Sequence, residues 1–512
     1  MKLMSITSGS KPSGHRDSMS ARFLIMILFI FGSAIPTLGQ GPIQNQTSSI
    51  MSLDTWDDLG GGVTGFDVVV KTIVEHGGYV YVGGVFDTAG DGVPARNIAR
   101  FNLSTSEWEA IGTGTDAGMG SMVNEIVVHN GLIYVGGYFS QMNGLDIANL
   151  AVYDPSGSGN WSSIGALGHS SPEFTNVFAL HVFGDDLYVG GEFQEVSQGG
   201  STLAVQHLAR YSITGESWHR VGEYTASDPF DIPFMDGMVM AIDGNDTDLV
   251  FGGMFTSAGG QTVNGVVLYK PGTDTWTALG QDDAIGMGDL FGFSGFLSDV
   301  VLGNGVVYVA GEFFHPESNE INRLGSYTIA DGTWTSLGDE IDGPIIKLLA
   351  HVDDQLFVSG EFTEVDGSPS VGVAQYIDLG GIGFWFPLGS LTNEGGMPSV
   401  FALGIANGRL IAGGRIVDAD GLSVNNIARW SADFGGGSGG DLPDIVLTGP
   451  GDGAEEVSII DPVTFSWSAP SGVTVSYYIL EIYTSDNPDF PFFSNSSFDP
   501  ILGTSFDYEQ DF

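Results

Sequence analysis

Short apolar stretches alternate with glycine-containing turns through most of the chain. A typical stretch is LIYVGG at residues 132–137, preceded by His129-Asn130-Gly131. Similar turn signals stand at residues 184–186, 303–305 and 406–408. Asn-Gly pairs between apolar runs of this length favour tight hairpins, and the runs are too short for helices. The pattern therefore predicts an all-β fold of short strands.

One pattern recurs seven times, and it divides the chain into units of about 50 to 60 residues. Each unit has the motif W-x-x-[LIV]-G, an apolar strand, a strand with a glycine pair, and a strand that ends in an aromatic residue. The tryptophans of the motif are Trp56, Trp108, Trp161, Trp218, Trp276, Trp334 and Trp385. Each unit is thus expected to hold four strands.

The order of the copies indicates how the units are arranged. A four-stranded unit cannot bury both faces alone, so the units must stack, either radially or as a linear solenoid. The chain opens with an isolated outer strand, Trp56 to Gly60, and its last unit ends at Trp430 without one. Pairing these two segments removes both free sheet edges. We therefore expect residues 41–434 to form a seven-bladed β-propeller closed by its N-terminal outer strand.

These repeats resemble a known family. The run LIYVGG, then NLAVYD at 149–154 and Trp161, is similar to the kelch repeat, and YVGGxF followed by NIARY-like strands resembles repeats of secreted bacterial propellers and fungal polarity markers. The resemblance covers residues 56–430 and implies a propeller fold. It implies little about activity, because kelch-type propellers serve as oxidases, isomerases, adaptors and adhesion modules.

The C-terminal segment has a different character. GGGSGG opens a flexible linker at residues 435–441, and residues 442–512 resemble the first half of a bacterial fibronectin type III domain. The resemblance rests on a strand ending in Trp467 and an alternating strand from Tyr477 to Tyr483. About 70 residues are few for such a sandwich, so we expect a truncated domain.

The N-terminal segment predicts export. The apolar run from Phe23 to Phe31 follows Lys2, Lys11, Arg16 and Arg22, as in a secretory signal peptide, which we place at residues 1–40. A secreted or cell-surface bacterial protein is expected, with no integral membrane segment once the signal is removed. The formal charge of −47 excludes nucleic acid as a partner. The absence of cysteine excludes disulfides, thiolate metal sites and the cross-linked cofactor of kelch-type oxidases.

Two long inserts mark a candidate binding face. In a propeller, the turns joining strands one to two and three to four lie on one face, and the remaining connections lie on the other, the loop face. Units four and five carry extended connections there, residues 226–238 and 281–296. Loops on a rigid scaffold are common binding sites. The candidate residues are Asp231, Phe234, Asp282, Asp283 and Phe291. The alternative is that the inserts only cover a blade or plug the channel.

A second set of candidates follows the glycine pairs. The residue after each pair is expected to lie on a ring around the axis, and these residues are Val85, Tyr138, Glu192, Met254, Glu312, Glu361 and Arg415. Three glutamates and one arginine could hold a cation or a polar ligand. Alternatively, they pair with one another and solvate the channel mouth.

The functional prediction is a binding or adhesion scaffold that uses the loop face to hold an extracellular protein or a polysaccharide. A polysaccharide-active enzyme on the same face is the alternative, and no catalytic residue is assigned. No cofactor is required by the sequence. Calcium stays open because carboxylates crowd at residues 243–248 and 418–421, although turn chemistry also accounts for them.

Overall fold

The computed structural model describes residues 4–6, 21–25, 55–116, 120–156, 159–222, 235–279, 296–314, 321–337, 341–351, 355–365, 367–378, 383–433, 446–449, 463–468, 481–484, 487–494 and 505–508. The chain divides into two compact units. One unit is Trp56–Ser431, and the other combines Met1–Thr55 with Ala432–Phe512. Among the described residues the regular structure is β-strand, apart from one 3-10 turn, η1 (Pro172–Phe174). No helix in this part of the chain is long and apolar enough to cross a membrane.

The larger unit contains seven four-stranded antiparallel sheets, which we number in chain order. In order from the first strand to the fourth, sheet 1 contains β5 (Val69–His76), β6 (Tyr79–Val85), β9 (Ile98–Asn102) and β10 (Glu107–Ala110). Sheet 2 contains β11 (Met122–His129), β12 (Leu132–Tyr138), β13 (Leu150–Asp154) and β14 (Asn160–Ser162). Sheet 3 contains β16 (Asn176–Phe183), β17 (Asp186–Glu192), β20 (Leu208–Ser212) and β21 (Ser217–His219), and sheet 4 contains β22 (Val239–Gly244), β23 (Leu249–Gly253), β26 (Val266–Lys270) and β27 (Thr275–Ala278). In the same order, sheet 5 is β28 (Phe296–Gly303), β29 (Val306–Phe314), β30 (Ile321–Thr328) and β31 (Thr333–Ser336); sheet 6 is β32 (Ile345–His351), β33 (Gln355–Gly360), β36 (Val373–Asp378) and β37 (Gly383–Pro387); sheet 7 is β39 (Val400–Ala406), β40 (Arg409–Gly414), β43 (Ile427–Asp433) and β3 (Trp56–Asp58).

The seventh sheet joins the two ends of this unit. Its fourth strand, β3, comes from the beginning of the unit and pairs antiparallel with β43, with Trp56 opposite Trp430. The guanidinium of Arg429 adds hydrogen bonds to both carboxylate oxygens of Asp57, at 3.0 to 3.2 Å. The pairing of these two segments is the one predicted from the repeat.

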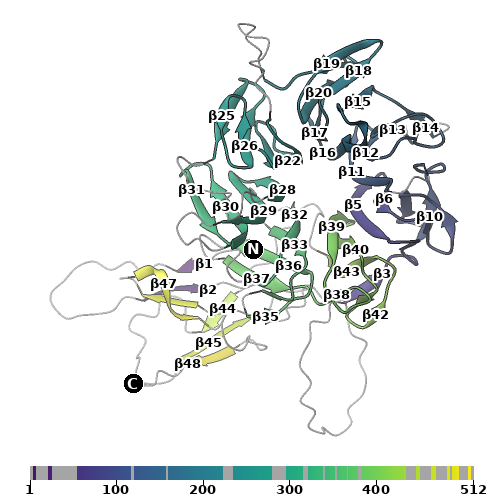
Figure 1. Cartoon of the computed structure of the whole chain (residues 1–512). Helices are drawn as coiled ribbons and strands as arrows, with labels where there is room; N and C mark the ends of the chain where they lie inside the picture. The colour runs from purple at the N-terminus through teal and green to yellow at the C-terminus, as the bar shows by residue number, and fades with distance from the viewer. Residues whose placement is uncertain are drawn as a thin grey trace. The chain divides into compact units, whose positions relative to one another are not determined.

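The first strands of the seven sheets follow one another in a circle (Figure 1). Each first strand contacts that of the next sheet, and β39 of sheet 7 contacts β5 of sheet 1. The apolar core is correspondingly divided into layers between successive sheets. In the layer between sheets 7 and 1, for example, Ile411 and Ile427 pack with Val70 and Val82. No sheet is left to bury its faces alone.

The tryptophans of the repeat couple neighbouring sheets. Each stacks on the aromatic residue opposite it in the third strand, with ring centroids 4.5 to 5.4 Å apart. Four indole Nε1 atoms also donate to the carbonyl of the apolar residue in the preceding W-x-x-[LIV]-G motif. These bonds are Trp56 to Leu388 (2.7 Å), Trp108 to Leu59 (2.9 Å), Trp218 to Ile164 (2.7 Å) and Trp334 to Leu279 (3.1 Å).

The glycine pairs permit close packing between sheets. A Cβ at Gly83 would lie 2.5 Å from Val123 Cγ1 in the next sheet, and a Cβ at Gly413 would lie 2.4 Å from Val70 Cγ1. The second glycine has a different constraint, since a Cβ at Gly84 would lie 2.0 Å from the carbonyl oxygen of Val69. Real Cβ atoms do not approach other atoms this closely, so both positions favour glycine.

Short additional strands lie within the connections between second and third strands and between fourth and first strands. They form three three-stranded and two two-stranded sheets. The three-stranded sheets are β4 (Val63–Thr64) with β7 (Thr88–Ala89) and β8 (Val93–Pro94); β15 (Ala166–Gly168) with β18 (Glu195–Gln198) and β19 (Ser201–Ala204); and β38 (Leu391–Thr392) with β41 (Asp418–Ala419) and β42 (Leu422–Ser423). The two-stranded ones are β24 (Ser257–Ala258) with β25 (Gln261–Thr262), and β34 (Glu364–Val365) with β35 (Ser368–Pro369).

The smaller unit has two sheets of its own. One is β1 (Met4–Ile6), β2 (Ala21–Ile25), β46 (Glu481–Thr484) and β47 (Asn487–Ser494), and the other is β44 (Val446–Gly449), β45 (Val463–Ser468) and β48 (Ser505–Tyr508). Strand β45 contains Trp467, and β46 covers the end of the predicted alternating strand. Strands β1 and β2 belong to the predicted signal peptide, so its removal would free the edge of β46. The linker at 435–441 lies outside the described residues.

The tryptophan contact between sheets can be tested with a matched pair of variants. Trp108→Phe removes the hydrogen bond to the Leu59 carbonyl but keeps an aromatic ring, so the free energy of unfolding should fall by about 1–2 kcal/mol. Trp161 is equally buried, but its Nε1 has no hydrogen-bond partner. Trp161→Phe loses the same ring atoms but no hydrogen bond, so it should cost about 1 kcal/mol less than Trp108→Phe. Urea unfolding followed by fluorescence measures both, and equal losses would contradict the assignment.

Ring closure predicts an unequal response to trimming the two ends. Deleting residues 41–62 removes β3 and exposes the edge of β43 together with the face of Trp430. Truncation after residue 435 leaves all seven sheets intact. The first change should abolish cooperative unfolding of the larger unit or lower its midpoint strongly, whereas the second should leave that transition in place. Calorimetry distinguishes the two, and a stable ring without β3 would disprove the closure.

Candidate functional site

The first strands carry a β-bulge at the same position in every sheet. The irregular residues are Lys71, Asn124, Phe178, Met240, Ser298, Ile346 and Phe401. All seven line one cavity of about 560 Å³, which is walled by the first strands and is not enclosed. Bulges commonly redirect side chains near functional sites. The cavity is therefore one candidate site.

Polar side chains in or next to this cavity accept hydrogen bonds from backbone N–H groups at the inner edges of the first strands. A first strand has no partner strand on its inner side, so side chains of the preceding sheet accept from its backbone N–H groups. The Ile126 amide donates to Thr72 Oγ1 (3.2 Å), and the Leu348 amide donates to Asp299 Oδ2 (2.7 Å). These contacts join equivalent positions of neighbouring sheets. The first strands therefore run in the same direction, and equivalent connections of all sheets lie on the same face.

An ammonium group shared by two carboxylates lies in the cavity. Lys347 Nζ of sheet 6 is 3.4 Å from Asp299 Oδ2 of sheet 5 and 3.7 Å from Glu125 Oε2 of sheet 2. Burial raises the pKa of both carboxyl groups, and Lys347 partly opposes that rise. Burial lowers the pKa of Lys347, but the two carboxylates outweigh burial and hold it above its usual value. The group is best described as a structural ion triad across the cavity.

His181 and Asp243 form a second, half-buried contact there, with Nδ1 and Oδ1 3.7 Å apart. Burial lowers the pKa of His181 to about 4 and raises the pKa of Asp243 to about 6. At no pH are both groups mainly charged, so this contact is not an ion pair. Asp243 Oδ2 accepts instead from the Leu302 amide of the next sheet, at 2.8 Å.

On the loop face, aspartates tie the connections of successive sheets together. Asp116, Asp236 and Asp342 each precede a first strand and accept from the amide and hydroxyl of a serine or threonine in the following sheet. The bonds are from Ser140 (3.0 and 2.9 Å), Thr256 (2.7 and 2.6 Å) and Thr363 (2.7 and 2.5 Å). Partial burial raises the pKa of these carboxyl groups, but the hydrogen bonds outweigh it and keep the pKa below its usual value. These bonds fix the connections of three sheets on the loop face.

Exposed apolar side chains gather on this same face. Among the described residues, six large hydrophobic side chains are exposed, and all six lie in connections between second and third or between fourth and first strands. They are Phe66 (89 % exposed), Leu145, Phe174, Met254, Met397 (59 %) and Leu422. None of the six lies in a turn of the opposite face. Single exposed apolar residues are ordinary, but their segregation to one face makes this face a second candidate site.

The predicted ring residues lie at the loop-face ends of the second strands. Tyr138 and Glu192 are half-buried there, whereas Glu361 is exposed, and Glu312 belongs to β29 opposite Phe296. Arg415 pairs with Asp67 at 2.7 Å, and both groups are largely exposed. The partner of Arg415 in this pair is therefore a residue outside the predicted ring. An exposed pair of this kind contributes little to stability.

The predicted insert residues cannot be placed in the same way. Asp231, Phe234, Asp282, Asp283 and Phe291 lie outside the described residues. The two segments weighed for calcium are described. Asp243 faces the cavity, Asp248 pairs with Lys270 (3.0 Å), and Asp420 accepts from the Ser390 amide (2.8 Å). Within the described ranges, no group of three or more histidine, aspartate or glutamate side chains is arranged to hold a metal ion.

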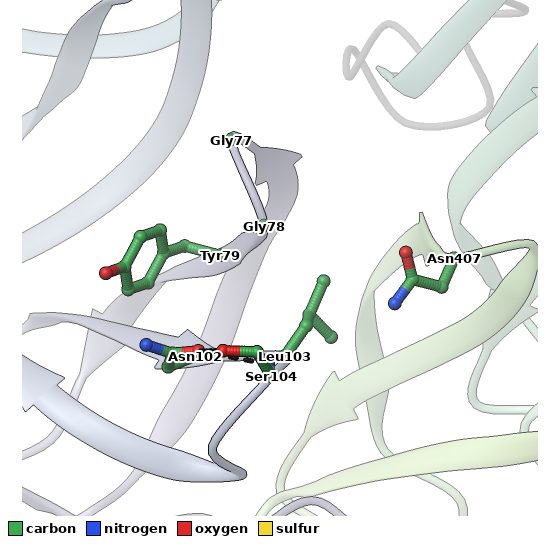
Figure 2. A pocket seen from close by; sticks show the side chains of 7 residues that line it. All are labelled: Gly77, Gly78, Tyr79, Asn102, Leu103, Ser104 and Asn407. Carbon is green, nitrogen blue, oxygen red and sulfur yellow. Dashed lines mark hydrogen bonds between the residues drawn. The ribbon is translucent and has the colours of Figure 1, made fainter.

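A second hollow, of about 470 Å³, lies on the opposite face between the turns of sheets 1 and 7. Figure 2 shows Gly77, Gly78, Tyr79, Asn102, Leu103 and Ser104 of sheet 1, with Asn407 of sheet 7 across from them. The Arg100 guanidinium lies 4.2 Å from the centre of the Tyr79 ring. No charged side chain lines the hollow itself. It offers turn backbone and amides, and we do not regard it as a functional site.

Comparisons with known proteins give only distant similarity. No protein-family model matches the sequence, and no curated protein matches it. The computationally designed Ika8 protein is similar over 73 % of this chain and 99 % of its own, with 12 % identity and a TM-score of 0.38. The extracellular domain of a protein described as a hybrid two-component system from B. thetaiotaomicron is similar over 84 % of this chain, with 12 % identity and a TM-score of 0.43.

The chain spans about half the length of that bacterial domain, 48 %. Both TM-scores are below 0.5, so these similarities add nothing to the description of the fold, which rests on the strand pairing itself.

The charged residues of the cavity are not among the sequence-predicted candidates, which belong to the two inserts and to the positions that follow the glycine pairs. Their signal is visible nonetheless. Lys71, Glu125, Asp299 and Lys347 each interrupt an otherwise apolar first strand. A charge within a buried strand requires a partner or a polar cavity. From this requirement, the sequence could have predicted that these four charged residues lie around a common cavity.

The two perturbed groups His181 and Asp243 predict opposite pH dependences of stability. Asp243 has a raised pKa in the fold, so its contribution to stability is present below pH 3.8 and is lost as the pH rises through 6. Asp243→Asn should therefore gain about 1–2 kcal/mol relative to wild type between pH 4 and pH 7.

His181 has a lowered pKa, so its contribution is present above pH 6.5 and is lost as the pH falls toward 4. His181→Gln should gain relative to wild type on acidification. Urea unfolding at a series of pH values measures both differences. Two differences that change in the same direction with pH would contradict these assignments.

Proposed function

We propose that the larger unit is a seven-bladed β-propeller that serves as a secreted or cell-surface binding scaffold, with the loop face as its binding surface. Support for the propeller comes from seven four-stranded sheets in one order, the circle of first strands, and the β3–β43 pairing. The signal-peptide pattern at residues 1–40 supports export. The fibronectin-like segment at 442–512 would then be a neighbouring spacer module.

The observation that carries the binding function is the segregation of exposed apolar side chains to the loop face. Phe66, Phe174, Met397 and Leu422 belong to connections of different sheets. Other aspartate bonds hold three of these connections. The Phe66 amide donates to Asp87 Oδ2 (3.4 Å), and the Ser390 amide of the Met397 connection donates to Asp420 Oδ1 of the Leu422 connection (2.8 Å), so less ordering is needed on binding. Rigid apolar residues surrounded by polar ones are the usual composition of a protein-binding surface.

The partner that fits this face best is an extracellular protein with an apolar contact surface and a basic rim. The chain has 62 acidic and 15 basic residues. Several of the acidic residues, among them Asp146, Glu173, Glu394 and Asp418, lie in the same connections as the exposed apolar residues. Charge complementarity therefore favours a basic partner.

A polysaccharide-active enzyme on this face has less support. An acid–base pair must have carboxyl groups that are free to exchange protons with a substrate. Three carboxyl groups line the cavity. Asp243 and Asp299 each accept a backbone amide, and Glu125 and Asp299 both contact Lys347. Their pKa values reflect burial and this shared ammonium group.

Selection of peptides from a random display library against the immobilised full chain tests this proposal. Enriched peptides should combine apolar residues with Lys or Arg, and they should bind a triple variant with Phe66→Ser, Met397→Ser and Leu422→Ser at least about tenfold more weakly. The matched control is Thr105→Ser with Thr214→Ser and Thr273→Ser, three changes on the opposite face.

Equal affinity for wild type and the loop-face variant would disprove the proposed surface. In parallel, soluble polysaccharides are incubated with the protein and assayed for new reducing ends. Cleavage that Glu125→Gln abolishes would favour the enzymatic alternative instead.

A further inference from the structure

The bulge positions around the cavity differ sharply in chemistry. Of the seven side chains there, only Lys71 is charged, and Asn124 lies on the neighbouring first strand. Four of the others, Phe178, Met240, Ile346 and Phe401, are large and apolar. The bulge positions thus offer one cation and one amide on adjacent sheets, and an apolar side chain on four of the five remaining sheets.

Lys71 has no counter-ion. Among the described residues no carboxylate oxygen lies within 4.0 Å of its Nζ, although acidic residues outnumber basic ones four to one in this chain. The side chain is partly buried, and burial together with the charge of Arg415 lowers its pKa. A partly buried ammonium group without a partner is unfavourable unless an anion or water solvates it.

Asn124 supplies an independent observation. It is only 8 % exposed, and its Nδ2 donates to Asn176 Oδ1 (2.9 Å) and to the Val177 carbonyl (2.8 Å). These bonds fix the amide orientation. Its Oδ1 is buried without a hydrogen-bond partner. Buried acceptors of this kind are rare in folded proteins, and each needs an explanation, such as a ligand that donates to it.

The acidic residues of the cavity do not compete for Lys71. Glu125 and Asp299 are one position further along their strands, where both contact Lys347. Thr72 Oγ1 also donates to Glu125 Oε1, at 3.1 Å. No internal partner therefore accounts for the positive charge of Lys71 or for the buried acceptor Asn124 Oδ1.

We propose that this cavity binds a small organic carboxylate that carries a hydrogen-bond donor and an apolar group. The carboxylate pairs with Lys71, the donor binds Asn124 Oδ1, and the apolar group packs against Phe178, Met240, Ile346 and Phe401. A volume of about 560 Å³ is typical of small-molecule sites. The site is separate from the proposed protein-binding loop face and does not depend on it.

Calorimetric titration of the full chain tests the site with three probes and their neutral analogues. The probes are phenylalanine, 3-phenyllactate and 4-hydroxyphenylacetate, which present an ammonium, an aliphatic hydroxyl and a phenol as the donor, and each is compared with its primary amide. At least one carboxylate should bind in the millimolar range or tighter, and at least about tenfold more tightly than its amide.

Variants of lysine assign the binding to the cavity. Lys71→Met should weaken carboxylate binding at least about tenfold, and Lys71→Arg should largely preserve it. Lys270→Met is the matched control, because it removes the same charge from a lysine paired with Asp248 outside the cavity. Circular dichroism and melting curves verify that each variant is folded. Absence of binding by all three carboxylates, equal binding of the amides, or unchanged binding by Lys71→Met would each overturn the proposal.

Discussion

The fold of the larger unit depends on how one sheet holds the next. In each repeat the tryptophan of the fourth strand stacks on the third strand of its own sheet. In four sheets its indole N–H reaches a carbonyl of the preceding one. The W-x-x-[LIV]-G motif thus provides both partners of the bond. Its tryptophan N–H donates to the preceding sheet, and the carbonyl of its apolar residue accepts from the tryptophan of the following sheet. A motif of this kind is useful only when it is repeated, because each copy completes its neighbour. The bond from Trp56 to Leu388 joins the beginning of the unit to its end, and the bond from Trp108 to Leu59 connects sheet 1 to the segment that follows the closing strand β3.

The same arrangement creates the interior cavity and determines its chemistry. A circle of first strands leaves the inner edge of every sheet unpaired, and a buried unpaired N–H group is costly. Thr72, Asp243 and Asp299 satisfy amides of the following strand, so polar residues are needed where an ordinary core would be apolar. Once carboxylates are present, Lys347 balances two of them. Lys71 and Asn124 Oδ1 are the groups that this internal pairing does not explain, and they are the basis of the proposed ligand site.

Much of this organisation was predictable from the sequence, because it repeats. The seven Trp positions, the glycine pairs and the unmatched segment at Trp56 together predicted the sheet order and the pairing with Trp430. What could not be predicted was contact across the circle. Lys347 and Glu125 are far apart in the chain and belong to sheets that are not neighbours, so no local pattern relates them. The partner of Arg415 was missed for a related reason, since Asp67 lies in a connection from the adjoining repeat unit and follows no motif.

The closing strand also determines where mechanical force would enter the ring. Strand β3 ends, and β43 begins, at the loop face, so Thr55 and the residues after Trp430 leave the ring together at the opposite face. If both ends were pulled, β3 would peel from β43 one hydrogen bond at a time, starting at Trp56. If only the C-terminal end were attached, the pull would run along β43, which is held between β40 and β3, and bonds on both sides would have to shear together. Attachment through the C-terminal end alone should therefore resist a higher pulling force. A force applied to the loop face would be transmitted through the full length of the strands before it reached this attachment point.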